Sequence, residues 1–231
     1  MGIRNRRAFA IGVVGITAAL LVGSAVAVAG PGKKGKGLVR GVHTEVSLIK
    51  ADGSTDAFVV DRGKVTAESQ NSVTLERKDG VSVTLGLGAN TKIRGDIQVD
   101  KGAIAFSRGG IAFAVLAPRG EKAAPLRLGG GEGLAQRMEK GRQGKGLMGA
   151  VHADVKLIKA DASTDAFSFD RGDVTAASDT SVTIKRADSP SVTKSISADT
   201  KLRGKLAVGG KAAVFSKGSA AFAILAAGPK G

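Results

Sequence analysis

The stretch VHTEVSLIKADGSTDAFVVDRGKVT, residues 42–66, returns as VHADVKLIKADASTDAFSFDRGDVT at residues 151–175 without an insertion or deletion. The same offset of 109 residues relates TKIRG to TKLRG and AFSRGGIAFAVLA to VFSKGSAAFAILA further along the chain. Such internal repetition predicts two tandem copies of one structural unit. Copy one comprises residues 37–117, and copy two comprises residues 146–226.

Apolar and polar residues alternate within the repeated stretch, and this period is typical of half-buried β-strands. The first predicted strand has an apolar face of Val42, Val46 and Leu48 and a polar face of His43, Glu45 and Ser47. In the next strand both copies keep apolar residues at positions 58 and 60, but Ser168 stands where copy one has Val59. Position 59 is therefore predicted to face outward.

Turn-forming residues separate the predicted strands. Asp79-Gly80 is typical of a tight hairpin between residues 73–75 and 81–83, because glycine tolerates positive φ. Pro190 predicts a turn or an exposed edge at the same point of copy two, since proline cannot donate a ladder hydrogen bond. Gly109-Gly110 separates the last two strands of copy one.

Each copy is thus expected to contain six or seven short antiparallel strands. A strand set this short most economically closes on itself. The predicted fold class is all-β, with two tandem small antiparallel β-barrel or barrel-like domains after an N-terminal signal segment. Phenylalanines recur at matching positions and are expected in the core: Phe58, Phe106 and Phe113, with Phe167, Phe169, Phe215 and Phe222.

The first 29 residues have the form of a secretory signal. Arg4, Arg6 and Arg7 precede an uncharged apolar run that ends in small residues, with a predicted cut after Ala29. NRRAFA also resembles a twin-arginine export signal. The predicted location is extracytoplasmic, secreted or associated with the cell envelope. The alternative is an uncleaved N-terminal helix as an anchor, because the apolar run is long enough to span a bilayer.

The formal net charge of +15 is concentrated outside the two copies. Copy one carries a net charge of +1 and copy two +3. The basic leader (30–36) carries +3 and the basic Gly-rich linker (118–145) carries +4, and residues 227–231 form the tail. The predicted partner is an anionic cell-envelope polymer or lipid surface, by electrostatic attraction. Ten residues are predicted to make the contact: Lys33, Lys34, Lys36, Arg119, Lys122, Arg127, Arg137, Lys140, Arg142 and Lys145.

Two further features of the linker region bear on function. GKGLMGAV (144–151) has the spacing of a phosphate-binding glycine loop. Such a loop follows a strand, but the residues before Gly144 are polar and glycine-rich, so no cofactor is expected. The linker also contains one short predicted helix near residues 132–140.

Histidine and carboxylate pairs are the candidates for a zinc site. His43 with Glu45, and His152 with Asp154, point the same way on a strand, but zinc usually takes three or four ligands. We therefore predict no metal site, and a solvent-facing histidine beside a carboxylate. The residues DGSTD (52–56) and their counterpart DASTD begin like a calcium loop but lack its ending, so a turn is expected.

The repeated DRG, at residues 61–63 in copy one, is predicted to mark a kink or bulge with a local Asp–Arg pair. The chain has no cysteine, hence neither a disulfide nor a thiol nucleophile, and no serine lies in a nucleophile-elbow motif. Tryptophan and tyrosine are also absent, which argues against specific nucleic-acid recognition by stacking. No catalytic residues are expected.

The pattern FxxDRGxVT, a short S/T-V-T hairpin, T-K-[IL]-R and a final F-S-x-G segment resembles secreted bacterial β-domains of unknown function that are common in high-GC organisms. The resemblance covers both copies and implies fold and location only.

Three hypotheses about function follow from the sequence. The first is a non-catalytic exported protein that acts as an envelope-associated binding or structural module with basic tethers. The second is a protein-interaction module that uses the duplicated domains, with two linked sites raising avidity. The third is a metal-dependent enzyme centred on His43 and His152 with nearby carboxylates.

Overall fold

The computed structural model describes residues 41–118, 150–188 and 191–229, which form thirteen β-strands and no helix. Copy one contains β1 (Gly41–Lys50), β2 (Thr55–Glu68), β3 (Ser72–Arg77), β4 (Ser82–Arg94), β5 (Gly102–Arg108) and β6 (Ile111–Leu116). Copy two contains β7 (Ala150–Lys159), β8 (Thr164–Ala177), β9 (Ser181–Lys185), β10 (Ser191–Ser195), β11 (Lys201–Arg203), β12 (Lys211–Lys217) and β13 (Ala220–Ala227). These residues include no apolar helix of membrane-spanning length.

Strand alternation follows the period in the sequence. On β1, Val42, Val46 and Leu48 are buried, whereas Glu45 and Ser47 on the opposite face are exposed. The prediction that the first strand has two distinct faces is confirmed.

Two predicted turns are confirmed, one with a different register. Gly80 has a φ of 85° and donates its N–H to the carbonyl of Arg77, and Gly109-Gly110 separates β5 from β6. Strands β3 and β4 pair Leu75 with Val83 and Val73 with Leu85. The predicted pairing of residues 73–75 with 81–83 is therefore wrong by a shift of two residues, since Val81 precedes β4.

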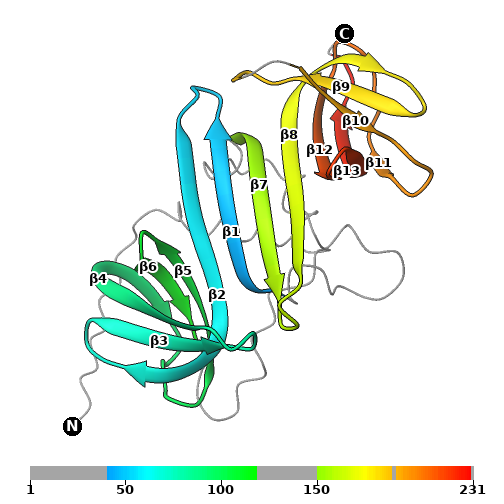
Figure 1. Cartoon of the computed structure of the whole chain (residues 1–231). Helices are drawn as coiled ribbons and strands as arrows, with labels where there is room; N and C mark the ends of the chain where they lie inside the picture. Colours follow the sequence, from blue (N-terminus) through cyan, green and yellow to red (C-terminus); the bar gives the residue numbers. More distant parts are fainter. Residues whose placement is uncertain (1–40, 119–149, 189–190, 230–231) are drawn as a thin grey trace.

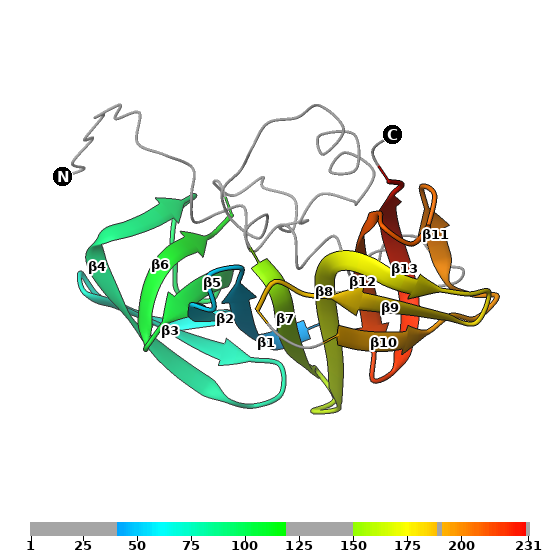
Figure 2. The same ribbon diagram turned by 90° about the horizontal axis from the view of Figure 1, so that it is seen from above.

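In each copy, the strand pairing outlines a partial ring. β2 pairs with β3, β3 with β4, β4 with β6, β6 with β5, and β5 with β2. Copy two repeats this arrangement with β8, β9, β10, β13 and β12, while β11 adds to β13. Figures 1 and 2 show the two curved ends of the molecule that result.

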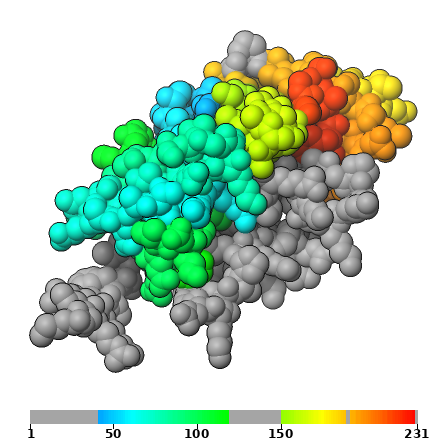
Figure 3. All heavy atoms as spheres, turned by 60° about the horizontal axis from the view of Figure 1, so that its bottom comes forward, coloured from blue at the N-terminus to red at the C-terminus, as the bar shows by residue number. Residues whose placement is uncertain are grey.

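The first strands of the two copies pair with each other. β1 runs antiparallel to β7, so β2, β1, β7 and β8 form a four-stranded centre between the two rings (Figure 1). The space-filling view shows β7, in yellow-green, directly against the blue and cyan surface of copy one (Figure 3). We name this β1–β7 pairing the junction.

Four clusters of buried apolar side chains lie within the described residues, and three of them support these parts. One fills the ring of copy one, around Val65, Leu75 and Val115, and a second fills the ring of copy two, around Val182 and Ile224. A third crosses the junction and combines residues of both copies: Val46, Leu48, Phe58, Ala150, Ala153 and Val155. The phenylalanines expected in the core are only partly so: Phe58 and Phe106 are buried, whereas the other five are half-buried and pack edge-on or tilted.

The prediction of an all-β chain is confirmed, but the prediction of purely antiparallel strands is wrong. The chain forms one thirteen-stranded mixed sheet that runs through both copies, and β4 and β6 are parallel. The physical reason is geometric. Strand directions cannot alternate all the way around a cycle of five strands, so at least one neighbouring pair must be parallel.

The backbone of the turn between β7 and β8 in copy two is strained, whereas the backbone of the equivalent turn between β1 and β2 in copy one is not. Gly53, between β1 and β2, has a φ of 77°, and Ala162, at the same place in copy two, has a φ of 60°. Positive φ costs an L-residue with a Cβ roughly 1 kcal/mol. We expect Ala162→Gly to raise the free energy of unfolding by about that amount in urea denaturation.

A matched control separates this effect from the general effect of glycine. Ala166 is an exposed residue inside β8, where a glycine gains no conformational relief. Ala166→Gly should lower stability, because glycine weakens a strand interior. If both variants shift stability in the same direction, relief of strain at Ala162 is excluded.

Candidate functional site: a buried histidine, carboxylate and arginine network

A polar network lies at one end of each ring interior. Asp61 on β2 stands opposite Ala105 of the ring core, and Arg77 ends β3 on the face that also carries Leu75. His43 of β1 stands opposite Asp61. Strands β1, β2 and β3 therefore bring charged side chains together. Elsewhere in the ring, the inward-facing positions of the strands carry apolar residues instead.

The contacts of copy one form a chain of charge-assisted hydrogen bonds. Nδ1 of His43 lies 2.7 Å from Oδ1 of Asp61, and Nε2 lies 3.1 Å from Oε1 of Glu45. Arg77 donates to Asp61 at 3.0 Å and clamps Asp79 with two further bonds of 3.0 and 2.7 Å. Ionised carboxylates only accept, so the imidazolium form of His43, in which both ring nitrogens donate, satisfies both contacts.

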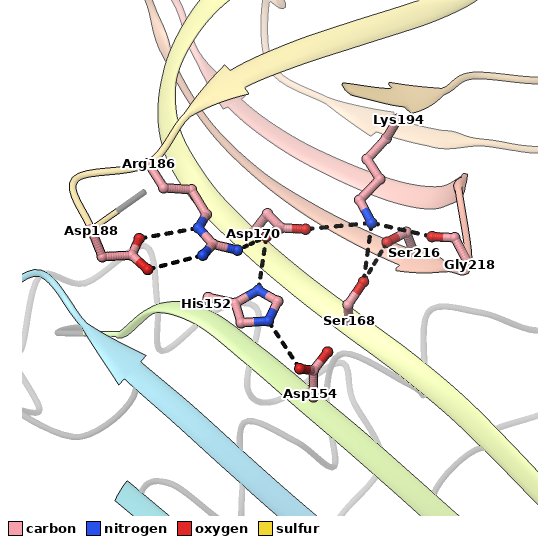
Figure 4. A network of polar contacts seen from close by, with 9 residues as sticks. All are labelled: His152, Asp154, Ser168, Asp170, Arg186, Asp188, Lys194, Ser216 and Gly218. Carbon is pink, nitrogen blue, oxygen red and sulfur yellow. Dashed lines mark hydrogen bonds and ion pairs between the residues drawn. The ribbon is translucent and has the colours of Figure 1, made fainter. Parts of the chain in front are cut away.

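Copy two repeats this network residue for residue (Figure 4). His152 contacts Asp170 at 2.8 Å and Asp154 at 3.0 Å. Arg186 donates to Asp170 at 2.8 Å and holds Asp188 through two bonds. Both central carboxylates are fully inside the protein, with Asp61 2% and Asp170 1% exposed.

Copy two adds a lysine to its network. Lys194 takes the place of the buried Leu85 and points toward Asp170, with its Nζ 3.6 Å from Oδ2 (Figure 4). The same Nζ donates to Ser168 at 3.2 Å, and Ser168 bonds Ser216 at 2.8 Å. Oδ2 of Asp170 is buried and has no hydrogen bond, so the nearby ammonium charge stabilises it electrostatically. The two copies therefore differ at the same site.

The surroundings shift the pKa values of His43, His152, Asp170 and Asp79 toward the charged forms. The hydrogen bond to Asp61 raises the pKa of His43 against the opposing effect of burial, and Asp170 does the same for His152. Burial favours the neutral form of Asp170, but bonds from His152 and Arg186 hold its pKa below the ordinary value. The bond from Arg77 likewise lowers the pKa of Asp79.

These shifts predict that stability falls as the solution becomes alkaline. The folded pKa values of His43 and His152 lie above the unfolded value of roughly 6.5. Their contribution is therefore fully present below pH of about 6.5 and is lost as pH rises through the folded values. We expect urea midpoints, followed by far-ultraviolet circular dichroism, to decrease across this range.

The control is a double variant, His43→Gln with His152→Gln, which removes both titrating groups. It should be less stable at low pH and should show a flatter dependence on pH above about 6.5. An unchanged slope would mean that other groups cause the pH effect.

Both networks lie close to the junction. One hollow of about 550 Å³ is lined by His152, Asp154 and Arg186 on one side and by the β1–β2 hairpin of copy one on the other. A second hollow, of about 1010 Å³, lies between Arg77 and the β7–β8 turn. Each hairpin thus approaches the network of the other copy.

The four metal candidates are placed in pairs, as predicted, but without further ligands. His43 contacts Glu45, and His152 contacts Asp154, each with one ring nitrogen. Within the described ranges, no three histidine or acidic side chains are grouped so as to hold a metal ion. The described histidines are half-buried rather than solvent-facing, because Asp61 and Asp170 engage their second nitrogens.

Other predictions about particular positions have mixed outcomes. Asp52 accepts bonds from Ser54 N–H and Oγ, so the predicted turn is confirmed. The bulge predicted at DRG is misplaced, because the bulge in β2 lies between Val65 and Ala67, and Asp61 pairs with His43 and Arg77.

Position 59 does not face outward as predicted. Val59 lies opposite the buried Ser107, and its counterpart Ser168 faces Ser216 and Lys194 inside copy two. The ten anion-contact residues, the signal segment, the predicted linker helix and Pro190 lie outside the described residues.

Reasoning along the sequence did not connect Asp61 with His43 or with Arg77, because these partners are 18 and 16 residues away in two different hairpins. Asp79 joins the network through Arg77, two residues before it. The two copies contained a usable signal. His43, Asp61, Arg77 and Asp79 are all retained as His152, Asp170, Arg186 and Asp188, although many residues around them differ.

Comparison of the chain with family models, with curated proteins and with solved structures found no match. The resemblance to secreted β-domains therefore stays a prediction.

Proposed function

We propose that this chain is an exported, non-catalytic module that binds or organises an anionic cell-envelope surface. In this proposal the basic leader and linker make the electrostatic contact, and the paired copies are the folded body. Each partial ring is regarded as a small barrel-like unit, since five strands pair in a cycle around an interior filled by apolar side chains.

One observation carries the non-catalytic part of the proposal: the ionisable groups of both networks are bound to one another. Asp61 accepts from His43 and Arg77, and the guanidinium of Arg77 is otherwise taken up by Asp79. A general base or nucleophile must instead face a reacting atom. A network of this kind holds β1, β2 and β3 in register, which is a structural role.

Co-sedimentation with purified cell envelopes over a salt series tests the electrostatic part. The chain without residues 1–29 is compared with a variant in which the ten predicted contact residues are replaced by Gln. We expect binding that weakens steeply with salt and is lost in the variant, because exposed charges are screened. Equal binding of both proteins at high salt would overturn the proposed contact.

A repeated surface feature favours protein interaction as a second candidate. Ile93 and Leu202 are 49% and 51% exposed, and Val99 and Val208 are 50% and 59% exposed, at equivalent positions of the two copies. Exposed apolar residues placed alike on both copies suit a protein partner. In the same sedimentation assay, binding that resists salt but disappears when these four residues become Ser would support this function.

A further inference from the structure

The register of the junction relates the two copies by a local two-fold axis. Val46 lies opposite Val155, which is its own counterpart at the repeat offset of 109 residues. On either side, Glu45 faces Lys156 and Ser47 faces Asp154, so positions pair reciprocally. This is the self-complementary arrangement of an isologous dimer, here made within one chain.

The paired edges are suited to each other on both faces. On the buried face, Val46 and Leu48 pack in one cluster with Ala153 and Val155. On the exposed face, Nζ of Lys156 lies 3.6 Å from Oε1 of Glu45. Each edge thus presents the same apolar row and a compatible polar row to its partner.

Opening the junction would leave both rings complete. The ring of copy one closes through the β2–β5 pairing and that of copy two through the β8–β12 pairing, and neither uses β1 or β7. Each first strand would remain held in its hairpin with β2 or β8. An opened junction therefore exposes two strand edges with unpaired backbone groups, which are templates for another strand.

We propose that the partner for this edge is a second copy of the same chain. In the exchanged form, β1 of one chain pairs with β7 of the other, and the reverse, with every contact of the junction retained. The balance between the single chain and the exchanged dimer then depends on chain concentration relative to the effective concentration of the two strands within one chain. This inference goes beyond the proposed function and does not depend on it.

Cysteine pairs on separate chains provide the test. The chain has no cysteine, so Glu45→Cys in one chain and Lys156→Cys in another are the only thiols in a mixture. Opposed residues of an antiparallel pair are near enough for a disulfide. The two variants are mixed at high concentration, unfolded in urea, refolded together and oxidised. We expect a disulfide-linked dimer that increases with chain concentration during refolding.

Two controls make the result decisive. A mixture of Lys156→Cys with Asp179→Cys, an exposed turn residue outside the junction, reports random collisions. A single chain with both Glu45→Cys and Lys156→Cys should close internally at low concentration, which verifies the register. If this chain closes but the mixture yields no more dimer than the collision control, exchange is refuted. If it fails to close, the junction itself is wrong and the proposal falls with it.

Light scattering on the unaltered chain gives a second measurement that needs no substitution. After refolding at increasing concentration, we expect a growing fraction with twice the mass of one chain. A constant single-chain mass at every concentration would contradict the exchange.

Discussion

Replacing Asp61 by Asn is expected to lower the free energy of unfolding of copy one by about 3–5 kcal/mol, because it leaves a buried positive charge without its partner. The side chain of Arg77 is 7% exposed and would keep Asp79 as its one anionic partner in this network, while the shorter bond of His43 would run to a neutral acceptor. The amide keeps the shape of the carboxylate, so the loss reports charge rather than packing. Urea unfolding by circular dichroism measures it, since the chain lacks Trp and Tyr for fluorescence.

A half-buried acid in an ion pair with an exposed arginine, on the same strand, serves as the control. Asp56 pairs with Arg108 at 2.7 Å, but the arginine side chain is 57% exposed. Asp56→Asn should therefore cost no more than about 1 kcal/mol. Equal losses for Asp56→Asn and Asp61→Asn would contradict the assignment of a buried, stabilising network.

The same substitution in copy two should have a larger effect. Asp170→Asn removes the partner of His152 and Arg186, and it also removes the carboxylate beside the ammonium of Lys194. The side chain of Lys194 is only 12% exposed, so its charge is poorly compensated by water. A smaller loss for Asp170→Asn than for Asp61→Asn would show that Lys194 does not depend on Asp170.

Replacing Val46 by Asp is expected to separate the two copies, at a cost of at least about 3 kcal/mol, because it buries an unpaired carboxylate. Val46 is 1% exposed and lies at the centre of the junction opposite Val155. Small-angle scattering should show a larger particle, while circular dichroism should retain the strand signal of the two rings. The rings are expected to persist because their pairing does not include β1.

The adjacent residue offers the control for this change. Ser47→Asp introduces the same charge on the exposed face of β1, opposite Asp154. Repulsion between like charges on neighbouring strands is small when both are solvated. The free energy of unfolding is therefore expected to fall by less than about 1 kcal/mol. If Ser47→Asp separates the copies as effectively as Val46→Asp, burial at the junction is not what holds them together.

Local features of the fold could be predicted because they depend on neighbouring residues. The alternation at Val42, Val46 and Leu48 marks the buried face, and Gly80 marks a turn that requires positive φ. The pairing of β4 with β6 could not be read in this way. It depends on how the β5–β6 hairpin folds back against strands that are distant in the sequence. No periodicity in the sequence indicates which strand edge this hairpin pairs with.

The candidate site was predictable only in part. His43 with Glu45 is a contact between side chains two residues apart on one strand, and the sequence shows it directly. The contact of His43 with Asp61 depends on the register of the first hairpin, and that of Arg77 with Asp61 on the register of the second. A shift of one residue in either register would place these groups on opposite faces.

By itself, the sequence determined that the chain has two copies of one all-β unit, which residues form the apolar faces, and where several turns fall, since repetition and alternation are properties of the linear order. Only the tertiary structure decided that β1 pairs with β7, that each cycle of five strands includes a parallel pair, and that Lys194 enters the network of copy two. These outcomes depend on which strand edges meet. Backbone edges are chemically alike, so their partners are selected by the packing of the whole chain.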